Sequence, residues 1–178
     1  MATKKAEKKT RCSGTMTESA YLAWIRSALR SKSLRWPPRN EALQRARRPY
    51  KGTNKLQKWE YHCDLCASWF KGKEVVVDHF PEPAGSILSV EDIGPFANNL
   101  YCEISNLRVL CKPCHDVHTY AEKNNVSFAE AYKQKQVIEI TKRPTADVLA
   151  FLQEHGYSGE VVSNAAKRKV LVERILNE

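Results

Sequence analysis

The sequence has no apolar run that approaches the roughly 20 residues needed for a membrane-spanning helix. It also has no internal repeat and no glycine-rich loop of the kind that holds nucleotide phosphates. The segment from Met1 to Arg11 is rich in lysine and lacks the apolar stretch of a secretory signal. These absences exclude a membrane-embedded protein and a repeat array, and they predict a soluble intracellular protein.

Acidic residues are scarce in the first third of the chain. Residues 1–60 contain 16 Lys and Arg but only 4 Asp and Glu, a net charge of +12, whereas the remainder carries −3 of the total of +9. A basic N-terminal third favours a polyanionic partner, most commonly nucleic acid. The alternative is a basic tail that only improves solubility. The candidates for phosphate contacts, which position a duplex without reading its sequence, are Arg26, Arg30, Arg39, Arg45, Arg47, Arg48 and Lys51.

Hydrophobic periodicity and helix-capping signals divide the chain into four parts. A capping box at Thr15–Glu18 opens a helix that must end near Trp36, because two prolines follow. The expected parts are a disordered basic tail over 1–14, a basic helical leader that binds nucleic acid over 15–58, a core over 59–124 and a helical region over 125–178.

Within these parts, the patterns predict helices and short strands. The core has two short strands, at 74–77 and 108–110, separated by a long connection in which a further short helix is expected near Ser89. The helices are expected at about 15–34, 38–47, 127–140, 145–155 and 164–176, and a further helix is expected to begin at about His115.

The six cysteines are spaced in a way that indicates metal binding rather than disulfides. Four of them form two Cys-x-x-Cys pairs, Cys63 with Cys66 and Cys111 with Cys114. Two such turns on either side of a strand–loop–strand can close one tetrahedral zinc site of four thiolates. Four thiolates leave no position for water, so this zinc would be structural; the alternative is four unrelated buried thiols.

Polar residues near the cysteine pairs carry the functional hypothesis. Asp78-His79 follows an apolar strand, Asn106 lies just before the second strand, and His115 comes directly after Cys114. A neutral imidazole can accept a proton near neutral pH, so His79 is the candidate general base. Since side chains alternate along an extended chain, the Asp78 carboxylate would face the other side and could hold a metal ion.

Three segments carry a resemblance to a known family. They resemble the signature segments of the HNH endonucleases, in the zinc-braced subgroup that includes phage-encoded members. The resemblance is specific over about 60 residues and rests on Val77–Phe80, Asn106–Cys111 and Cys114–His115, with Thr119 following. It implies an α+β fold, in which a small ββα-metal, treble-clef-like core braced by a four-cysteine zinc is flanked by N-terminal basic helices and C-terminal helices.

The resemblance also implies a site and a reaction. Asp78 and His115 would bind one divalent ion, Mg²⁺ or Mn²⁺ and alternatively Zn²⁺ or Ni²⁺, which steadies the scissile phosphate and the leaving group. Asn106 would hold the His79 ring by a hydrogen bond. His118, one turn after His115, is either a third metal contact or an exposed polar residue. The substrate implied is DNA.

Two points stay open at this stage. A zinc-braced module that binds nucleic acid without cutting it would explain the charge and the cysteines but would make Asp78-His79 accidental. If the chain is phage-encoded, its location would be the host cytoplasm and a DNA-packaging component is a candidate partner. The sequence shows no recognisable dimer interface, so the oligomeric state is not predicted.

Overall fold

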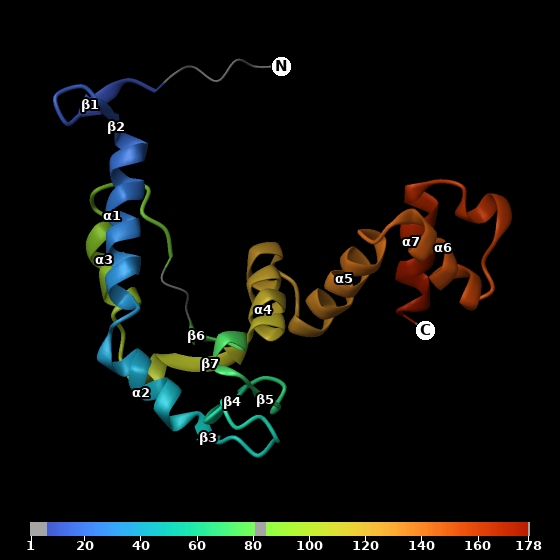
Figure 1. The fold of residues 1–178 in the computed structure, drawn as a ribbon. Helices are drawn as coiled ribbons and strands as arrows, with labels where there is room; N and C mark the ends of the chain where they lie inside the picture. Colours follow the sequence, from blue (N-terminus) through green and yellow to red (C-terminus); the bar gives the residue numbers. More distant parts are fainter. Residues whose placement is uncertain (1–6, 81–84, 178) are drawn as a thin grey trace. The chain divides into compact units, whose positions relative to one another are not determined.

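The computed structural model describes residues 7–80 and 85–177 of the chain (Figure 1). Across these ranges the protein is α+β, with seven α-helices and three small antiparallel sheets. The chain divides into two compact units, Met1–Lys112 and Pro113–Glu178. This division differs from the one expected from the sequence, because the basic leader packs with the strands of the expected core in the first unit.

The first unit contains a pair of antiparallel strands, β6 (Val75–His79) and β7 (Leu107–Cys111). Val77 lies opposite Val109, and both are buried in a cluster that also contains Ala42. Because side chains alternate along a strand, Asp78 and His79 project from opposite faces of the pair. Both predicted strands are confirmed, and both are longer than predicted.

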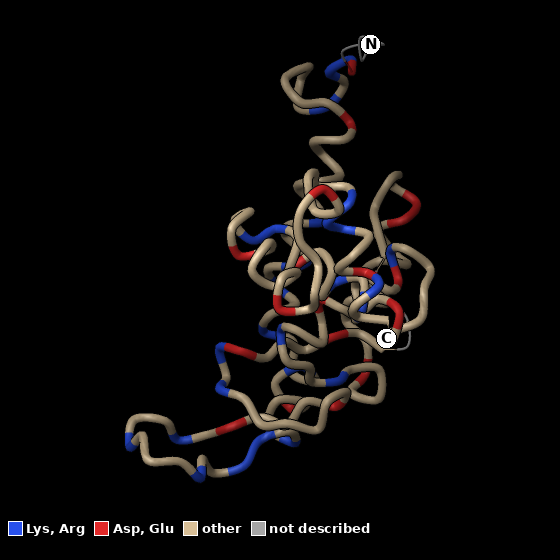
Figure 2. Tube along the Cα trace, turned by 90° about the vertical axis from the view of Figure 1, so that its right-hand side faces the viewer, with Lys and Arg blue, Asp and Glu red and all other residues tan. Residues whose placement is uncertain are grey.

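The basic segment before β6 forms a helix and a second small sheet. Helix α2 (Pro37–Arg45) begins with two prolines, whose fixed φ suits a first helical turn. It is followed by the antiparallel sheet β3 (Arg47–Pro49), β4 (Trp59–His62) and β5 (Trp69–Phe70), in that spatial order. The loop between β3 and β4 protrudes from this sheet at the lower end of Figure 2. A short 3-10 turn at Gly72–Glu74 then leads into β6.

Two helices, α1 (Glu18–Ser33) and α3 (Ile93–Leu100), pack together in the first unit (Figure 1). The apolar face of α1 meets Phe96 and Leu100 of α3 through Leu22, with Ile87 completing the buried cluster. Tyr101 follows α3 and donates its hydroxyl to the Leu29 carbonyl at 2.8 Å. A 3-10 turn at Ile104–Asn106 connects this segment to β7.

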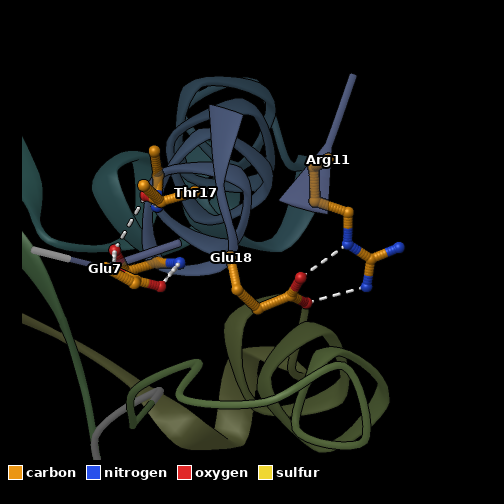
Figure 3. A network of polar contacts seen from close by, with 6 residues as sticks. Glu7, Arg11, Thr17 and Glu18 are labelled. Atoms are coloured by element: carbon orange, nitrogen blue, oxygen red, sulfur yellow. Dashed lines mark hydrogen bonds and ion pairs between the residues drawn. The ribbon is translucent and has the colours of Figure 1, made fainter. Parts of the chain in front are cut away.

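The amino-terminal segment differs from the prediction of disorder over 1–14. Residues 1–6 lie outside the described residues, but β1 (Lys9–Arg11) pairs with β2 (Met16–Thr17) in a small hairpin. Figure 3 shows the reason: Arg11 donates to both carboxylate oxygens of Glu18, at 2.6 and 2.7 Å. This ion pair joins the hairpin to the first turn of α1.

The start of α1 also corrects the predicted capping box. Thr15 does not cap the helix, because its hydroxyl donates to the Cys12 carbonyl within the hairpin turn. The cap is Thr17, whose side-chain oxygen accepts from the Ala20 amide at 3.2 Å. The Glu18 carboxylate forms an ion pair with Arg11 (Figure 3), so it is not the reciprocal partner of Thr15 in a capping box.

The second unit is helical. Its core is formed by buried residues of three helices and the turn between the last two, among them Val137, Leu152, Val162 and Val172. These helices confirm the three predicted at the C-terminal end. The helices of this unit are α4 (Lys112–Asn124), which begins at the boundary, α5 (Phe128–Thr141), α6 (Thr145–Glu154) and α7 (Ala165–Ile175), with a 3-10 turn at Gly159–Val162.

No helix in the described part of the chain combines the length and the apolar character that crossing a membrane requires.

Candidate metal centre and Asp78-His79 site

The four cysteines predicted to bind zinc lie together. The sulfur atoms of Cys63, Cys66, Cys111 and Cys114 are all within 4.8 Å of one another. A tetrahedral zinc with Zn–S bonds of about 2.3 Å would separate its sulfurs by about 3.8 Å, so these atoms are close enough to share one ion. The predicted cluster is confirmed, and its donor set suits a structural metal such as zinc.

A tight turn places the first cysteine pair. Ala67 donates its amide to the Cys63 carbonyl at 2.9 Å, and the Cys63 amide donates to the Ser68 carbonyl at 3.0 Å. Ala67 closes this turn with φ of 55°, a left-handed conformation that is strained for any residue with a Cβ. Bringing both sulfurs to the same side therefore costs the turn some stability.

Asp64 anchors this turn to β7. Its amide donates to the Val109 carbonyl at 2.9 Å, and its carboxylate accepts from the Val109 amide at 3.1 Å. The second cysteine pair begins at Cys111, two residues farther along β7. The anchor thus sets the spacing between the two pairs. Sequence reasoning missed Asp64, although an acidic residue inside a Cys-x-x-Cys turn is a signal that could have been noted.

The Cys63 sulfur is prepared to be a thiolate. Burial by itself raises the pKa of this thiol. The amides of Cys66, Cys111 and Leu65 donate to the sulfur, and together with a side-chain hydrogen bond to Cys66 they lower the pKa to about 7. The Cys111 amide lies 3.2 Å from the Cys63 sulfur. Because thiolates rather than thiols bind zinc, this lowered pKa favours metal binding near neutral pH.

Asp78 lies opposite a residue that the sequence reading did not single out. The register of β6 and β7 pairs Asp78 with Arg108, and the Arg108 guanidinium donates to Asp78 Oδ2 from two nitrogens, at 3.0 and 3.2 Å. Both side chains are mostly covered, at 13% exposed for Arg108 and 16% for Asp78. The Arg108 guanidinium also stacks on the Phe80 ring. A cation of the protein thus already faces the carboxylate predicted to bind a metal.

His79 is held by a backbone carbonyl. Its Nε2 lies 3.1 Å from the carbonyl oxygen of Leu100, which ends α3. A carbonyl oxygen can only accept, so Nε2 must carry the proton in this hydrogen bond. In the neutral ring the proton-free nitrogen is then Nδ1. The fold therefore selects one tautomer and leaves a specific nitrogen able to take up a proton.

Asn106 does not make the hydrogen bond to the His79 ring that the resemblance implied. Its side-chain oxygen accepts from the Ser105 hydroxyl at 2.9 Å, and its backbone carbonyl accepts from the Phe80 amide at 2.8 Å. Asn106 thus braces the residue after His79, while Leu100 orients the ring. Sequence reasoning missed Leu100 because a backbone carbonyl has no side-chain signature.

The two other candidate histidines lie on α4. His115 falls in its first turn, directly after Cys114. His118 is one turn later, and its Nδ1 lies 3.5 Å from the Glu122 carboxylate, four residues along the helix. Glu122 is therefore a local partner of His118. The role of His118 as a third metal contact stays a prediction.

The structure already engages several of the basic residues predicted to contact phosphate. Arg39 donates to the Val77 carbonyl at 3.1 Å and so joins α2 to β6. Burial lowers the pKa of its guanidinium. Arg48 pairs with Glu60 at 2.6 Å, and its guanidinium lies over the Trp69 ring. The others are Arg26, half-buried on α1; Arg30, over the Phe96 ring; Arg45, paired with Glu41; Arg47, over the Trp59 ring; and Lys51, exposed in the β3–β4 loop.

The fold and the four cysteines define an α+β protein with a cluster suited to a structural metal such as zinc. Comparison with known proteins adds no relative, since no family model, no curated protein and no solved structure matches the chain.

Proposed function

We propose that this chain is a metal-dependent HNH endonuclease that hydrolyses phosphodiester bonds of DNA. The observation that carries the proposal is the hydrogen bond from His79 Nε2 to the Leu100 carbonyl, because it leaves Nδ1 as the basic atom of a half-buried imidazole. A strand that ends in a carboxylate and an oriented imidazole, beside a four-cysteine cluster, is the arrangement that the resemblance to this family implies.

The residues of the chain would divide the work of hydrolysis. His79 Nδ1 removes a proton from a water molecule, whose oxygen attacks phosphorus while the bond to the 3′ oxygen breaks. The leaving oxygen departs with the electron pair of that bond, and the His79 imidazolium returns its proton to solvent. Arg108, fixed beside Asp78, would place positive charge near the phosphate.

The divalent ion implied by the family has two candidate protein donors, Asp78 and His115. A carboxylate oxygen and an imidazole nitrogen are donors that Mn²⁺, Zn²⁺ and Ni²⁺ accept, and Mg²⁺ is held through carboxylates and waters. When bound, such an ion would neutralise charge on the scissile phosphate and on the leaving oxygen. The Arg108 guanidinium on Asp78 opposes cation binding at that carboxylate, so the donors fit only if the ion competes with Arg108.

The same pairing favours a second candidate function. A zinc-braced module that binds nucleic acid without cutting it needs no metal at Asp78, and Arg108 would then neutralise that carboxylate permanently. This alternative keeps the charge-based prediction of a nucleic-acid partner and gives up catalysis.

A plasmid-nicking assay in Mg²⁺, Mn²⁺, Zn²⁺ and Ni²⁺ separates the two functions. We expect His79→Ala to lower the cleavage rate by about 10² to 10⁴-fold, the usual contribution of a general base. The matched control is His155→Ala, since His155 also bonds a backbone carbonyl, that of Phe151, but lies far along the sequence, directly after the last turn of α6. Equal nicking by His79→Ala and the parent protein, or no nicking in any of the four metals, would rule out the nuclease.

A further inference from the structure

The loop between β3 and β4 is a basic, exposed segment of the first unit. Between Glu41 and Glu60 the chain has six basic residues and no acidic one. The two flanking acids neutralise the nearest arginines, since Glu41 pairs with Arg45 and Glu60 pairs with Arg48. The positive charge that is left therefore lies mainly in the loop itself, which Figure 2 shows as a protrusion that carries several basic positions.

Three lysines of the loop, Lys51, Lys55 and Lys58, are exposed and have no ion-pair partner among the described residues. Their charges are therefore available to an outside anion. Between them, Leu56 is 92% exposed, the largest exposed fraction among the large apolar side chains of the described chain. Because Leu56 lies between these lysines in the sequence, the loop offers a partner both positive charge and apolar contact area.

The tip of the loop has a defined conformation. The Leu56 amide donates to the Asn54 side-chain oxygen at 3.0 Å, and the Gln57 amide donates to the Asn54 carbonyl at 3.1 Å. The Tyr50 phenol packs against Gly52, where a Cβ would overlap the ring. The Tyr50 amide also donates to the Lys58 carbonyl at 3.1 Å, which extends the ladder into the loop. Since the tip is ordered in advance, binding of a partner loses less entropy there.

The base of the loop is rigid as well. Arg47 lies opposite Tyr61 and Arg48 opposite Glu60 in the β3–β4 pairing. The Arg47 guanidinium stacks on Trp59, 4.2 Å from the ring centre, on the partner strand. These cross-strand contacts hold the two strands as a ribbon that ends in the basic tip.

We propose that the β3–β4 hairpin inserts its loop, residues 50–58, into the major groove of B-form DNA. Lys51, Lys55 and Lys58 would contact the phosphates that border the groove, and Leu56 would contact base edges at its floor, where thymine presents a methyl group. The inference rests on the DNA partner of the proposed function and does not depend on cleavage.

The shape of the hairpin decides which nucleic acid it fits. The major groove of B-form DNA is about 12 Å wide and admits a two-stranded ribbon. The major groove of A-form RNA is too narrow and deep for side chains to read. A duplex of DNA is therefore the expected ligand, and an RNA duplex of the same sequence is the discriminating comparison.

The test measures binding of the full chain to a DNA duplex across a series of salt concentrations. All proteins carry His79→Ala, and no divalent metal is added, so cleavage does not interfere. The hairpin variant is Lys51→Gln, Lys55→Gln, Lys58→Gln. Its matched control removes the same number of charges from exposed positions of the second unit, Lys123→Gln, Lys133→Gln, Lys142→Gln. Circular dichroism and zinc content confirm that each variant is folded.

Loss of three phosphate contacts should reduce the slope of log K against log salt by about 2.7, and lower affinity at least about tenfold at moderate salt. The control triple should leave the slope unchanged. Leu56→Ala should weaken binding about threefold to tenfold with no change in slope, because it removes apolar contact and no charge.

Three results would overturn the inference. They are an unchanged slope in the hairpin triple, an equal reduction in the control triple, and an RNA duplex that shows the same dependence on the hairpin. Failure of the inference is distinguishable from failure of the nuclease. If a protein with an intact His79 cleaves DNA and the hairpin triple does not change this cleavage, only the proposed groove contact is wrong. If DNA binding depends on the hairpin but no cleavage occurs, only the proposed nuclease activity is wrong.

Discussion

Asp78 and Arg108 lie directly opposite each other across β6 and β7, and the Arg108 guanidinium donates to Asp78 Oδ2 from two nitrogens. The pair is largely covered, so its attraction is screened less than that of a surface ion pair. The carboxylate of the proposed active site is thus positioned by an arginine before any substrate or ion arrives. Two consequences can be measured, one for metal binding and one for stability.

Removing Arg108 should make the proposed active-site ion bind more tightly. Arg108→Gln takes away a positive charge about 3 Å from the carboxylate, so Mn²⁺ should bind at a concentration several-fold lower. Isothermal titration of Mn²⁺ into the zinc-loaded protein measures the change. Asp78→Asn is the control and should abolish the same binding event. A Mn²⁺ affinity that is the same with and without Arg108 would show that Asp78 does not hold the ion.

The same pair should be visible in unfolding. Arg108→Gln and Asp78→Asn each remove one member of this covered pair, while the double variant removes both. We expect a coupling free energy of about 1 to 3 kcal/mol in a double-mutant cycle measured by urea unfolding. Additive single and double changes would contradict a direct stabilising interaction between Asp78 and Arg108.

Two hydrogen bonds hold the segment that orients His79. Tyr101 donates to the Leu29 carbonyl at 2.8 Å, and Trp36 Nε1 donates to the Cys102 carbonyl at 2.8 Å, with the two rings edge to face. Tyr101→Phe removes one donor with little loss of volume, so it should lower the free energy of unfolding by about 1 kcal/mol. If the segment positions His79 in catalysis, cleavage should fall further than stability explains, with kcat rather than KM affected. Tyr132→Phe is the control, because Tyr132 is exposed on α5.

Zinc binding should weaken as the pH falls through about 7. The hydrogen bonds to the Cys63 sulfur lower the pKa of this thiol from its ordinary value of 9.0 to about 7, against the opposing effect of burial. Its contribution to stability is therefore fully present above about pH 9 and is lost as the pH falls through about 7. Competition with a chromogenic chelator between pH 9 and pH 5 measures the zinc affinity.

The zinc measurement has two reference variants. Cys12→Ser should leave the pH profile unchanged, because Cys12 lies outside the four-cysteine cluster. Cys111→Ser should lose zinc at every pH and unfold, because structural zinc supplies folding free energy. A zinc affinity that stays constant between pH 9 and pH 5 would contradict binding by thiolates.

Ala67 occupies a left-handed conformation in the turn that places Cys63 and Cys66, with φ of 55°. Glycine adopts this conformation without steric cost, so Ala67→Gly should raise the free energy of unfolding by about 1 kcal/mol. The matched control is Ala28→Gly, at an exposed position inside α1, where the same substitution should destabilise by about 1 kcal/mol. Thermal unfolding of the zinc-loaded proteins measures both. Equal signs for the two substitutions would rule out strain at Ala67.

The sequence by itself determined the features that arise from neighbouring residues. Periodic apolar positions and proline stops located α1, α2 and the three C-terminal helices, because a helix is built from contacts within a few residues. The spacing of the two Cys-x-x-Cys pairs was sufficient to predict the metal cluster, since each pair needs only a local turn and the strands between them bring the turns together.

Only the tertiary structure decided which groups face the proposed site residues. Leu100 reaches the His79 ring from 21 positions away and Arg108 reaches Asp78 from 30 positions away, in each case through strand register and helix packing. Local capping rules likewise chose Thr15 over Thr17, because they could not foresee that Arg11 would return to bind Glu18. Contacts between distant residues depend on how the whole unit packs, and the sequence pattern around each residue carries no record of that packing.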